Sequence, residues 1–148
     1  METKEFKTMF GEVAASRGFV AGGGGWYRVL LMGLFVLALQ KSNLGEYFEL
    51  NLKLFLNQTV PKDAASLKKM TKSMSGDIFR RQPEQYRPAF DLESGINVIE
   101  RKRLLEVLFD EIVDQIAAGA NAPSGLLRLR EQGVIFLLPS VEAQLKAG

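Results

Sequence analysis

Polar and apolar residues alternate in GEYFELNLKLFLN, residues 45–57, which predicts a half-buried β-strand. An apolar run from Val29 to Leu39 precedes this segment, and the residues between the two, including Gly45, favour a hairpin turn. With Leu44–Gly45 at the centre of the loop, the predicted cross-strand pairs on one face, the first face, are Leu39–Leu50, Leu37–Leu52 and Phe35–Leu54. A shift of one residue would place Leu39 opposite Glu49, so the apolar pattern favours this register.

The opposite face of the predicted hairpin, the second face, is too apolar to be open to water. Antiparallel sheets with one solvated face usually alternate more cleanly between apolar and polar positions. We therefore expect a cover for the second face, either the chain's own helices or a second molecule. A protein partner or a second copy of the chain would contact Leu34, Val36, Ala38, Asn51, Lys53 and Phe55.

Four glycines, residues 22–25, precede the apolar run. A membrane helix needs about 20 apolar residues, whereas this run holds eleven. A phosphate-binding loop would lead into a helix, but Trp26 and the residues after it are strand formers. We therefore predict a flexible connector at residues 22–25, a strand at residues 26–31, and a turn or bulge at Gly33.

Helical periodicity appears before and after the predicted strands. Residues 3–17 are amphipathic, and residues 97–118 repeat apolar pairs every four positions, with Asn97 and Glu100 at capping-box spacing. The weaker elements are a helix after Pro61, an edge strand at residues 77–81, and helices at residues 124–132 and 139–146. This order predicts an α+β fold with an N-terminal helix, a small antiparallel sheet of three to four strands, and C-terminal helices packed on the sheet.

Length and composition exclude several classes of protein. A chain of 148 residues with 47% hydrophobic and 24% charged residues is typical of a single globular domain, residues 1–148. Histidine and cysteine are both absent, which excludes a Ser-His-Asp triad, a cysteine nucleophile and a Cys/His zinc site. We expect no cofactor and no metal. The N-terminal residues lack the order of a signal peptide, so we expect a cytoplasmic protein that does not enter a membrane.

The chain resembles an uncharacterised bacterial family, domain of unknown function 4304, over roughly its first third. The residues that carry the resemblance are Phe10, Gly18-Phe19, Trp26-Tyr27-Arg28, Leu39-Gln40-Lys41-Ser42, Gly45, Phe48 and Asn51-Leu52. The family is basic between its Gly-Phe and Trp-Tyr-Arg elements, whereas this chain continues with Phe19-Val20-Ala21-Gly22. The resemblance implies a small bacterial α+β domain and supplies no binding or catalytic residue.

Polar side chains cluster at the end of the predicted hairpin, where they could line a pocket with aromatic walls. The residues of this predicted pocket are Trp26, Tyr27, Gln40, Lys41, Tyr47 and Glu49. A buried pair of Lys41 and Glu49 could transfer protons, because burial and opposite charge shift pKa values. The alternative is that these side chains keep the hairpin in register.

Two charged segments have their own alternatives. Cations and aromatic residues are interleaved between Lys62 and Arg87, which suits a nucleic acid, while an ordinary solvated loop is the alternative. The candidate nucleic-acid contacts are Lys68, Lys69, Lys72, Arg80 and Arg81. Three acidic residues lie on one face of a predicted helix at intervals of four residues: Glu106, Asp110 and Asp114. This face is either solvated or a surface that binds a cation or a basic partner.

These patterns lead to a functional hypothesis with one alternative. We expect a small cytoplasmic bacterial interaction module without catalytic activity, which binds a protein partner or itself through the second face. The alternative is a nucleic-acid-binding domain that uses the basic segment 62–88.

Overall fold

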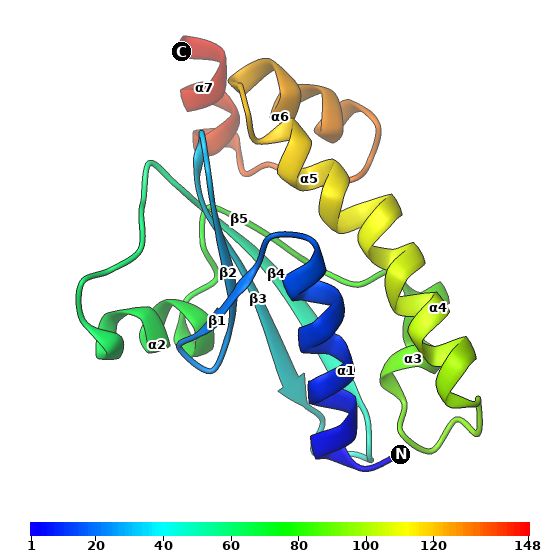
Figure 1. Cartoon of the computed structure of the whole chain (residues 1–148). Coiled ribbons are helices and arrows are strands. Elements are labelled where there is room, and N and C mark those ends of the chain that lie inside the picture. Colours follow the sequence, from blue (N-terminus) through cyan, green and yellow to red (C-terminus); the bar gives the residue numbers. More distant parts are fainter.

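The computed structural model describes all residues, from Met1 to Gly148, and has the predicted α+β architecture. The strands are β1 (Val20–Gly22), β2 (Gly25–Leu30), β3 (Gly33–Lys41), β4 (Phe48–Leu56) and β5 (Ile78–Arg81). They form one antiparallel sheet in chain order, in which each strand pairs with the next (Figure 1). The sheet therefore has five strands rather than three to four, because β1 extends it on the side of β2.

One helix precedes the strands in the chain, one lies between β4 and β5, and the others follow β5 (Figure 1). Those up to the third α-helix are α1 (Thr3–Ser16), α2 (Ala64–Ser73), the short 3₁₀ turn η1 (Glu84–Tyr86) and α3 (Arg87–Phe90). The later ones are α4 (Val98–Leu108), the π-helical turn η2 (Phe109–Val113), α5 (Asp114–Gly119), α6 (Pro123–Glu131) and α7 (Pro139–Ala147). No helix is both long enough and apolar enough to cross a bilayer.

The register of the β3–β4 hairpin confirms the prediction from the apolar pattern. Leu39 pairs with Leu50, Leu37 with Leu52, and Phe35 with Leu54. The ladder closes at Lys41 and Phe48, and one further hydrogen bond of 2.9 Å joins Ser42 N to Tyr47 O. Leu44 and Gly45 lie at the centre of the loop, as predicted, and the turn forms without a positive φ at Gly45.

The glycine run forms the ordered turn between β1 and β2, so the prediction of a flexible connector is wrong. Gly23 and Gly24 have φ values of 63° and 81°, which other residues rarely adopt. At Gly25 a Cβ atom would lie 2.5 Å from the carbonyl oxygen of Leu37 and 2.7 Å from the Thr71 side chain in α2. These residues are glycines because the turn packs closely against β3 and α2.

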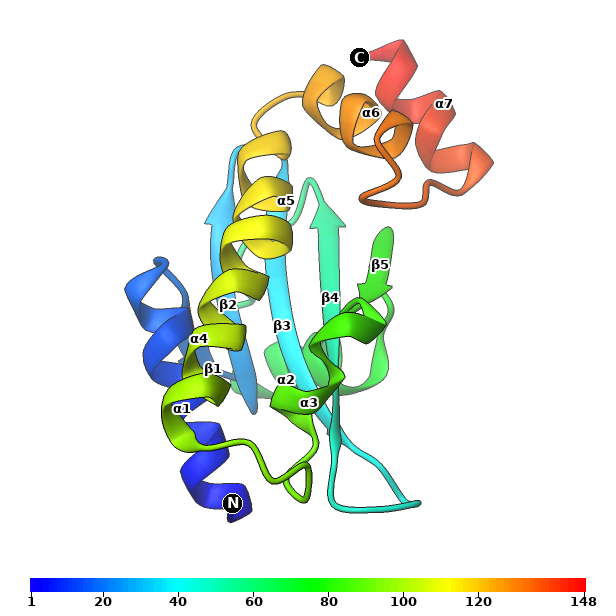
Figure 2. The ribbon, with the colours of Figure 1, turned by 90° about the vertical axis from the view of Figure 1, so that its right-hand side faces the viewer.

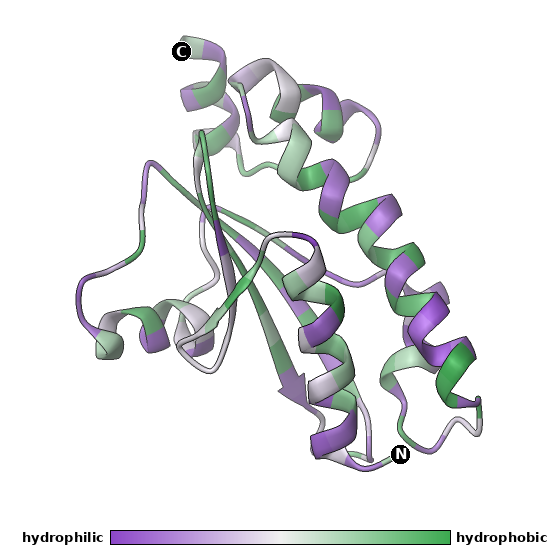
Figure 3. Cartoon of the chain, in the orientation of Figure 1, coloured by the Kyte–Doolittle hydropathy of each residue, from purple (hydrophilic) through white to green (hydrophobic).

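The first face of the sheet carries the main core, which is covered by α1 and by the long helix α4–η2–α5 (Figure 2). Phe6 and Phe10 of α1 are fully buried, and Phe10 lies 5.5 Å, centroid to centroid, from Phe109 of η2. Hydrophobic and hydrophilic residues alternate along these helices, as expected for helices with one buried face (Figure 3). The apolar pattern thus fixes which side of each helix meets the sheet.

The second face is covered by α2, which lies on the opposite side of the sheet from α4 (Figure 2). Leu67 and Met70 of α2 pack against Leu34, Val36 and Phe55. The helix begins at an Asp63 cap, whose carboxylate accepts hydrogen bonds from Ser66. The second face therefore receives its cover from within the chain, one of the two alternatives that the sequence left open.

The long helix after residue 97 begins as predicted, since the Asn97 side chain accepts a hydrogen bond of 2.8 Å from Glu100 N. It ends at Gly119, but the π-helical turn in its middle was not predicted. Arg101 is almost fully buried in α4 and donates to the carbonyl oxygens of Pro88, Ala89 and Asp91. This arginine therefore joins α4 to α3 and to Asp91, the residue after α3.

Candidate functional site

The six residues predicted for a partner interface lie together on the second face, but they are buried beneath α2 rather than exposed. The exposed fraction is zero for Leu34 and Val36 and reaches no more than 7% in the other four, Ala38, Asn51, Lys53 and Phe55. Their burial follows from the contacts of Leu67 and Met70 described above. A partner cannot contact these residues while α2 occupies this position.

Lys53 connects the second face to α2 through its buried ammonium group. Its Nζ donates to the carbonyl oxygen of Thr71 at 2.6 Å and to that of Met70 at 3.5 Å. These carbonyls belong to the last turn of α2, where a cation also meets the negative end of the helix dipole. Burial, together with the nearby charge of Lys72, lowers the pKa of Lys53 below its ordinary value.

A polar network continues the second face beyond Lys53. The Asn51 amide donates to Gln40 Oε1 at 3.1 Å, and Arg81 Nε donates to Asn51 Oδ1 at the same distance. Gln40 and Asn51 also line a pocket of about 250 Å³, whose opposite wall is formed by Thr71 and Lys72 of α2. The structure therefore brings two amide side chains close to two cations, Lys72 and Arg81.

The cations of the basic segment divide into two groups. Lys68, Lys69 and Lys72 are exposed on α2, and Arg81 is exposed on β5. None of these four is within ion-pair distance of a carboxylate. Arg80, by contrast, points to the other side of the sheet and donates to the carbonyl oxygen of Val134 at 2.6 Å. Alternation along a strand predicts this separation of Arg80 from Arg81.

The residues predicted to line a pocket at the hairpin end do not form one site. Trp26 packs against Phe10 on the first face, with ring centroids 4.8 Å apart and the rings tilted by 57°, whereas Tyr27 packs beside the α2 contacts on the second face. Lys41 pairs with Glu46 at 3.1 Å, and Tyr47 lies under the guanidinium group of Arg87. Only Gln40 and Glu49 remain cross-strand neighbours. The structure therefore does not bring the six residues into one pocket, and it pairs Lys41 with Glu46 rather than with Glu49.

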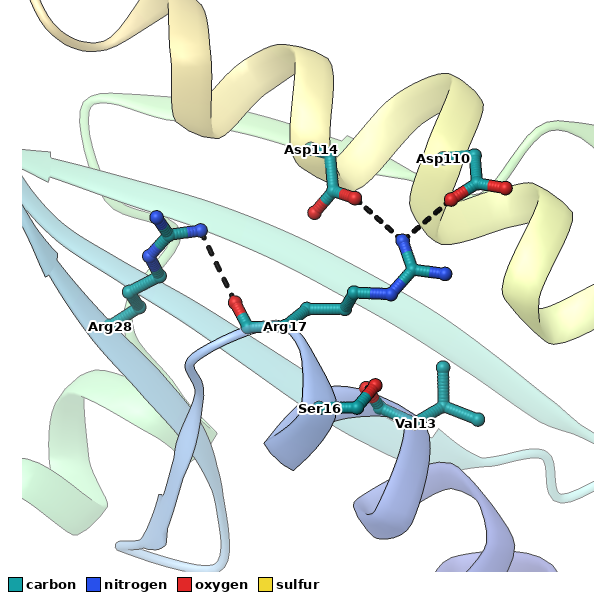
Figure 4. Close-up of polar contacts among 6 residues, drawn as sticks. All are labelled: Val13, Ser16, Arg17, Arg28, Asp110 and Asp114. Atoms are coloured by element: carbon teal, nitrogen blue, oxygen red, sulfur yellow. Dashed lines mark hydrogen bonds and ion pairs between the residues drawn. The ribbon is translucent and has the colours of Figure 1, made fainter.

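The acidic helix face is partly neutralised by Arg17, at the end of α1 (Figure 4). Its Nη1 donates to Asp110 Oδ1 at 2.7 Å and to Asp114 Oδ2 at 2.6 Å. Burial lowers the pKa of Arg17, but the two hydrogen-bonded carboxylates outweigh burial and raise the pKa overall. No local sequence pattern predicts this contact, because 93 residues separate Arg17 from Asp110.

No family model, curated protein or solved structure matches this chain. The resemblance to domain of unknown function 4304 stays a prediction. Function is therefore inferred from the geometry of the chain itself.

Proposed function

We propose that this chain is a binding module without catalytic activity and that its partner is a single-stranded nucleic acid. The observation that carries the proposal is the basic surface formed by Lys68, Lys69, Lys72 and Arg81. All four side chains are exposed, and none has a carboxylate partner. Unpaired cations on one surface attract phosphate groups and release the counterions condensed on a nucleic acid.

The surroundings of the basic surface suit a single strand better than a duplex. Arg81 and Lys72 flank the exposed amide of Gln40, whose N–H groups can donate to the edges of unpaired bases. Phe79 is 38% exposed on β5, two residues before Arg81 and therefore on the same face. Aromatic rings beside a basic groove are platforms for stacked bases.

The charge around this surface supports the same proposal. Acidic side chains in the segment have local partners: Asp63 caps α2, Asp77 accepts from Leu56 N, and Glu84 pairs with Arg87. Glu49, the acid next to the amides, accepts a hydrogen bond from Gln82. Hydrogen bonds from neutral groups leave these carboxylates charged, but residues 62–88 carry seven Lys and Arg against three Asp and Glu. This segment therefore has a net charge of +4, although that of the whole chain is only +2.

The experiment is a fluorescence-anisotropy titration of a labelled oligothymidylate with the purified chain at low salt. Inorganic polyphosphate of matched charge serves as competitor, because it offers phosphates without bases. We expect binding that Phe79→Ala weakens and that polyphosphate displaces only at excess. Absence of binding at low salt would refute the proposal, and equal affinity for both polymers would refute the role of the bases.

A protein partner on the second face is a second candidate, and it requires α2 to move away. The observation that favours it is the small apolar cluster between α2 and the sheet, which has five buried residues, two of them from α2, against 32 in the main core. Few buried contacts allow local opening at a free energy below that of global unfolding. Native-state hydrogen exchange tests this candidate, since α2 amides that exchange only through global unfolding would contradict it.

A further inference from the structure

A groove of about 590 Å³ lies between the end of α1 and helix α5. These two helices lie on the side of the sheet opposite α2 (Figure 2). The polar lining of the groove comes from Ser16, Arg17, Arg28, Asp114 and Asn121. The volume falls within the range of small-molecule sites in proteins. None of these residues belongs to the basic surface of the proposed function.

Arg28 brings a positive charge to the groove that no carboxylate of the chain neutralises. Its Nη1 donates to the carbonyl oxygen of Arg17 at 3.2 Å, and this is the guanidinium group's one hydrogen bond within the chain. No acidic side chain lies within ion-pair distance. Gly18, with a φ of 87°, lets the Arg28 side chain pass directly beside the turn after α1. The remaining N–H groups of this half-buried fork are available to a ligand carboxylate.

Asp114 brings a negative charge to the same groove. One carboxylate oxygen, Oδ2, accepts from Arg17, while the other accepts no hydrogen bond within the chain. Arg17 is shared with Asp110, so the two carboxylates together exceed the single cation that pairs with them. Figure 4 shows Arg17 and Arg28 beneath the helix that carries Asp114, with only Arg17 bonded to it. Arg28 and Asp114 thus line one groove with opposite charges and are not paired with each other.

We propose that this groove binds a small zwitterion, such as a free α-amino acid or a dipeptide. The ligand carboxylate would accept from Arg28, and the ligand ammonium group would donate to the free oxygen of Asp114. Arg17 is already paired with Asp110 and Asp114, so Arg28 is the unpaired cation of the groove. Asp114 disfavours a simple anion and Arg28 a simple cation, because like charges repel at short range in a partly buried site. The partly negative carboxyl end of α1 also favours the ammonium group.

Isothermal titration calorimetry tests the proposal with glycylglycine as the probe. Two derivatives separate the charges: N-acetylglycylglycine lacks the ammonium group, and glycylglycine amide lacks the carboxylate. We expect the unmodified dipeptide to bind at least tenfold more tightly than either derivative, which corresponds to about 1.4 kcal/mol. Equal affinity for the three compounds, or no heat of binding for any of them, would overturn the proposal.

Variants locate the binding in this groove. Arg28→Gln and Asp114→Asn should each reduce dipeptide affinity at least tenfold, and Arg28→Lys should reduce it less, because lysine keeps the charge without the fork. Asp110→Asn is the matched control, since it removes one carboxylate from Arg17 and leaves both proposed contacts in place. Thermal unfolding of each variant establishes that it is folded. Unchanged affinity in folded Arg28→Gln would overturn the assignment, and oligothymidylate binding, which uses other residues, should stay unchanged.

Discussion

The salt dependence of nucleic-acid binding gives a quantitative test of the basic surface. Each phosphate contact with a single strand contributes about −0.7 to the slope of log affinity against log salt concentration. Four contacts, from Lys68, Lys69, Lys72 and Arg81, therefore predict a slope of about −2.8. Affinity should then fall about 50-fold between about 50 mM and 200 mM salt.

Removing two of the four cations should halve this slope. In the double variant Lys72→Gln with Arg81→Gln we expect a slope of about −1.4 and a loss of only about sevenfold over the same salt range. Both side chains are exposed, so the free energy of unfolding should change little, although Arg81 gives up its hydrogen bonds to Asn51 and Gln40. The assay is the anisotropy titration with oligothymidylate, repeated at several salt concentrations.

A control variant that loses the same charge elsewhere distinguishes binding at the basic surface from general electrostatic attraction to the chain. Lys4 and Lys102 are also exposed and have no carboxylate partner, but they lie in a different groove, between α1 and α4. These two helices are on the opposite side of the sheet from α2 (Figure 2). The double variant Lys4→Gln with Lys102→Gln should keep the full slope. An identical decrease in both double variants would refute a localised basic surface, and an unchanged slope without Lys72 and Arg81 would refute their contacts.

Three stability predictions concern the supports of the two faces, each measured by urea denaturation. Leu67→Ala should lower the free energy of unfolding by about 2–3 kcal/mol, because it removes one of the two apolar contacts of α2, and a change near zero would contradict the packing. Burial lowers the pKa of Lys53, so Lys53 loses its proton at a lower pH in the folded state than in the unfolded state. The free energy of unfolding of wild type should therefore rise relative to that of Lys53→Met as the pH rises toward 10.5. A difference that does not change with pH would contradict this. Arg101→Leu should cost about 1–3 kcal/mol, because the buried Ala89 carbonyl loses its donor while those of Pro88 and Asp91 keep Ser94; a stability equal to wild type would contradict this.

Local periodicity was sufficient to predict the hairpin and most helices. A shift by one residue would have placed Glu49 opposite Leu39, so the alternation of residues 45–57 allowed only one register. Asn97 likewise identified the start of α4 through its spacing to Glu100. These features depend on neighbours in the chain, and a single sequence displays such neighbours directly.

Features that depend on distant contacts were not predictable in the same way. The glycines at residues 22–25 indicated a turn, but their close approach to Leu37 and Thr71 requires the folded sheet and α2. Arg17 reaches the acidic helix face across 93 residues, with no pattern around it to indicate a partner. The groove between the end of α1 and α5 depends on the same long-range contact, which explains why neither Arg17 nor Arg28 was predicted as a site residue.

Helix α2 links the fold to the proposed function, because it has one role on each of its sides. Its inner side contributes Leu67 and Met70, which remove the second face from solvent and so exclude direct docking of a partner there. Its outer side contributes three of the four cations of the basic surface. Lys53 fixes the end of α2 next to the Gln40–Asn51 amides, and this contact sets where Lys72 stands relative to Arg81. The apolar residues of the second face therefore support the proposed interface only indirectly, because they hold in place the helix that carries the exposed lysines.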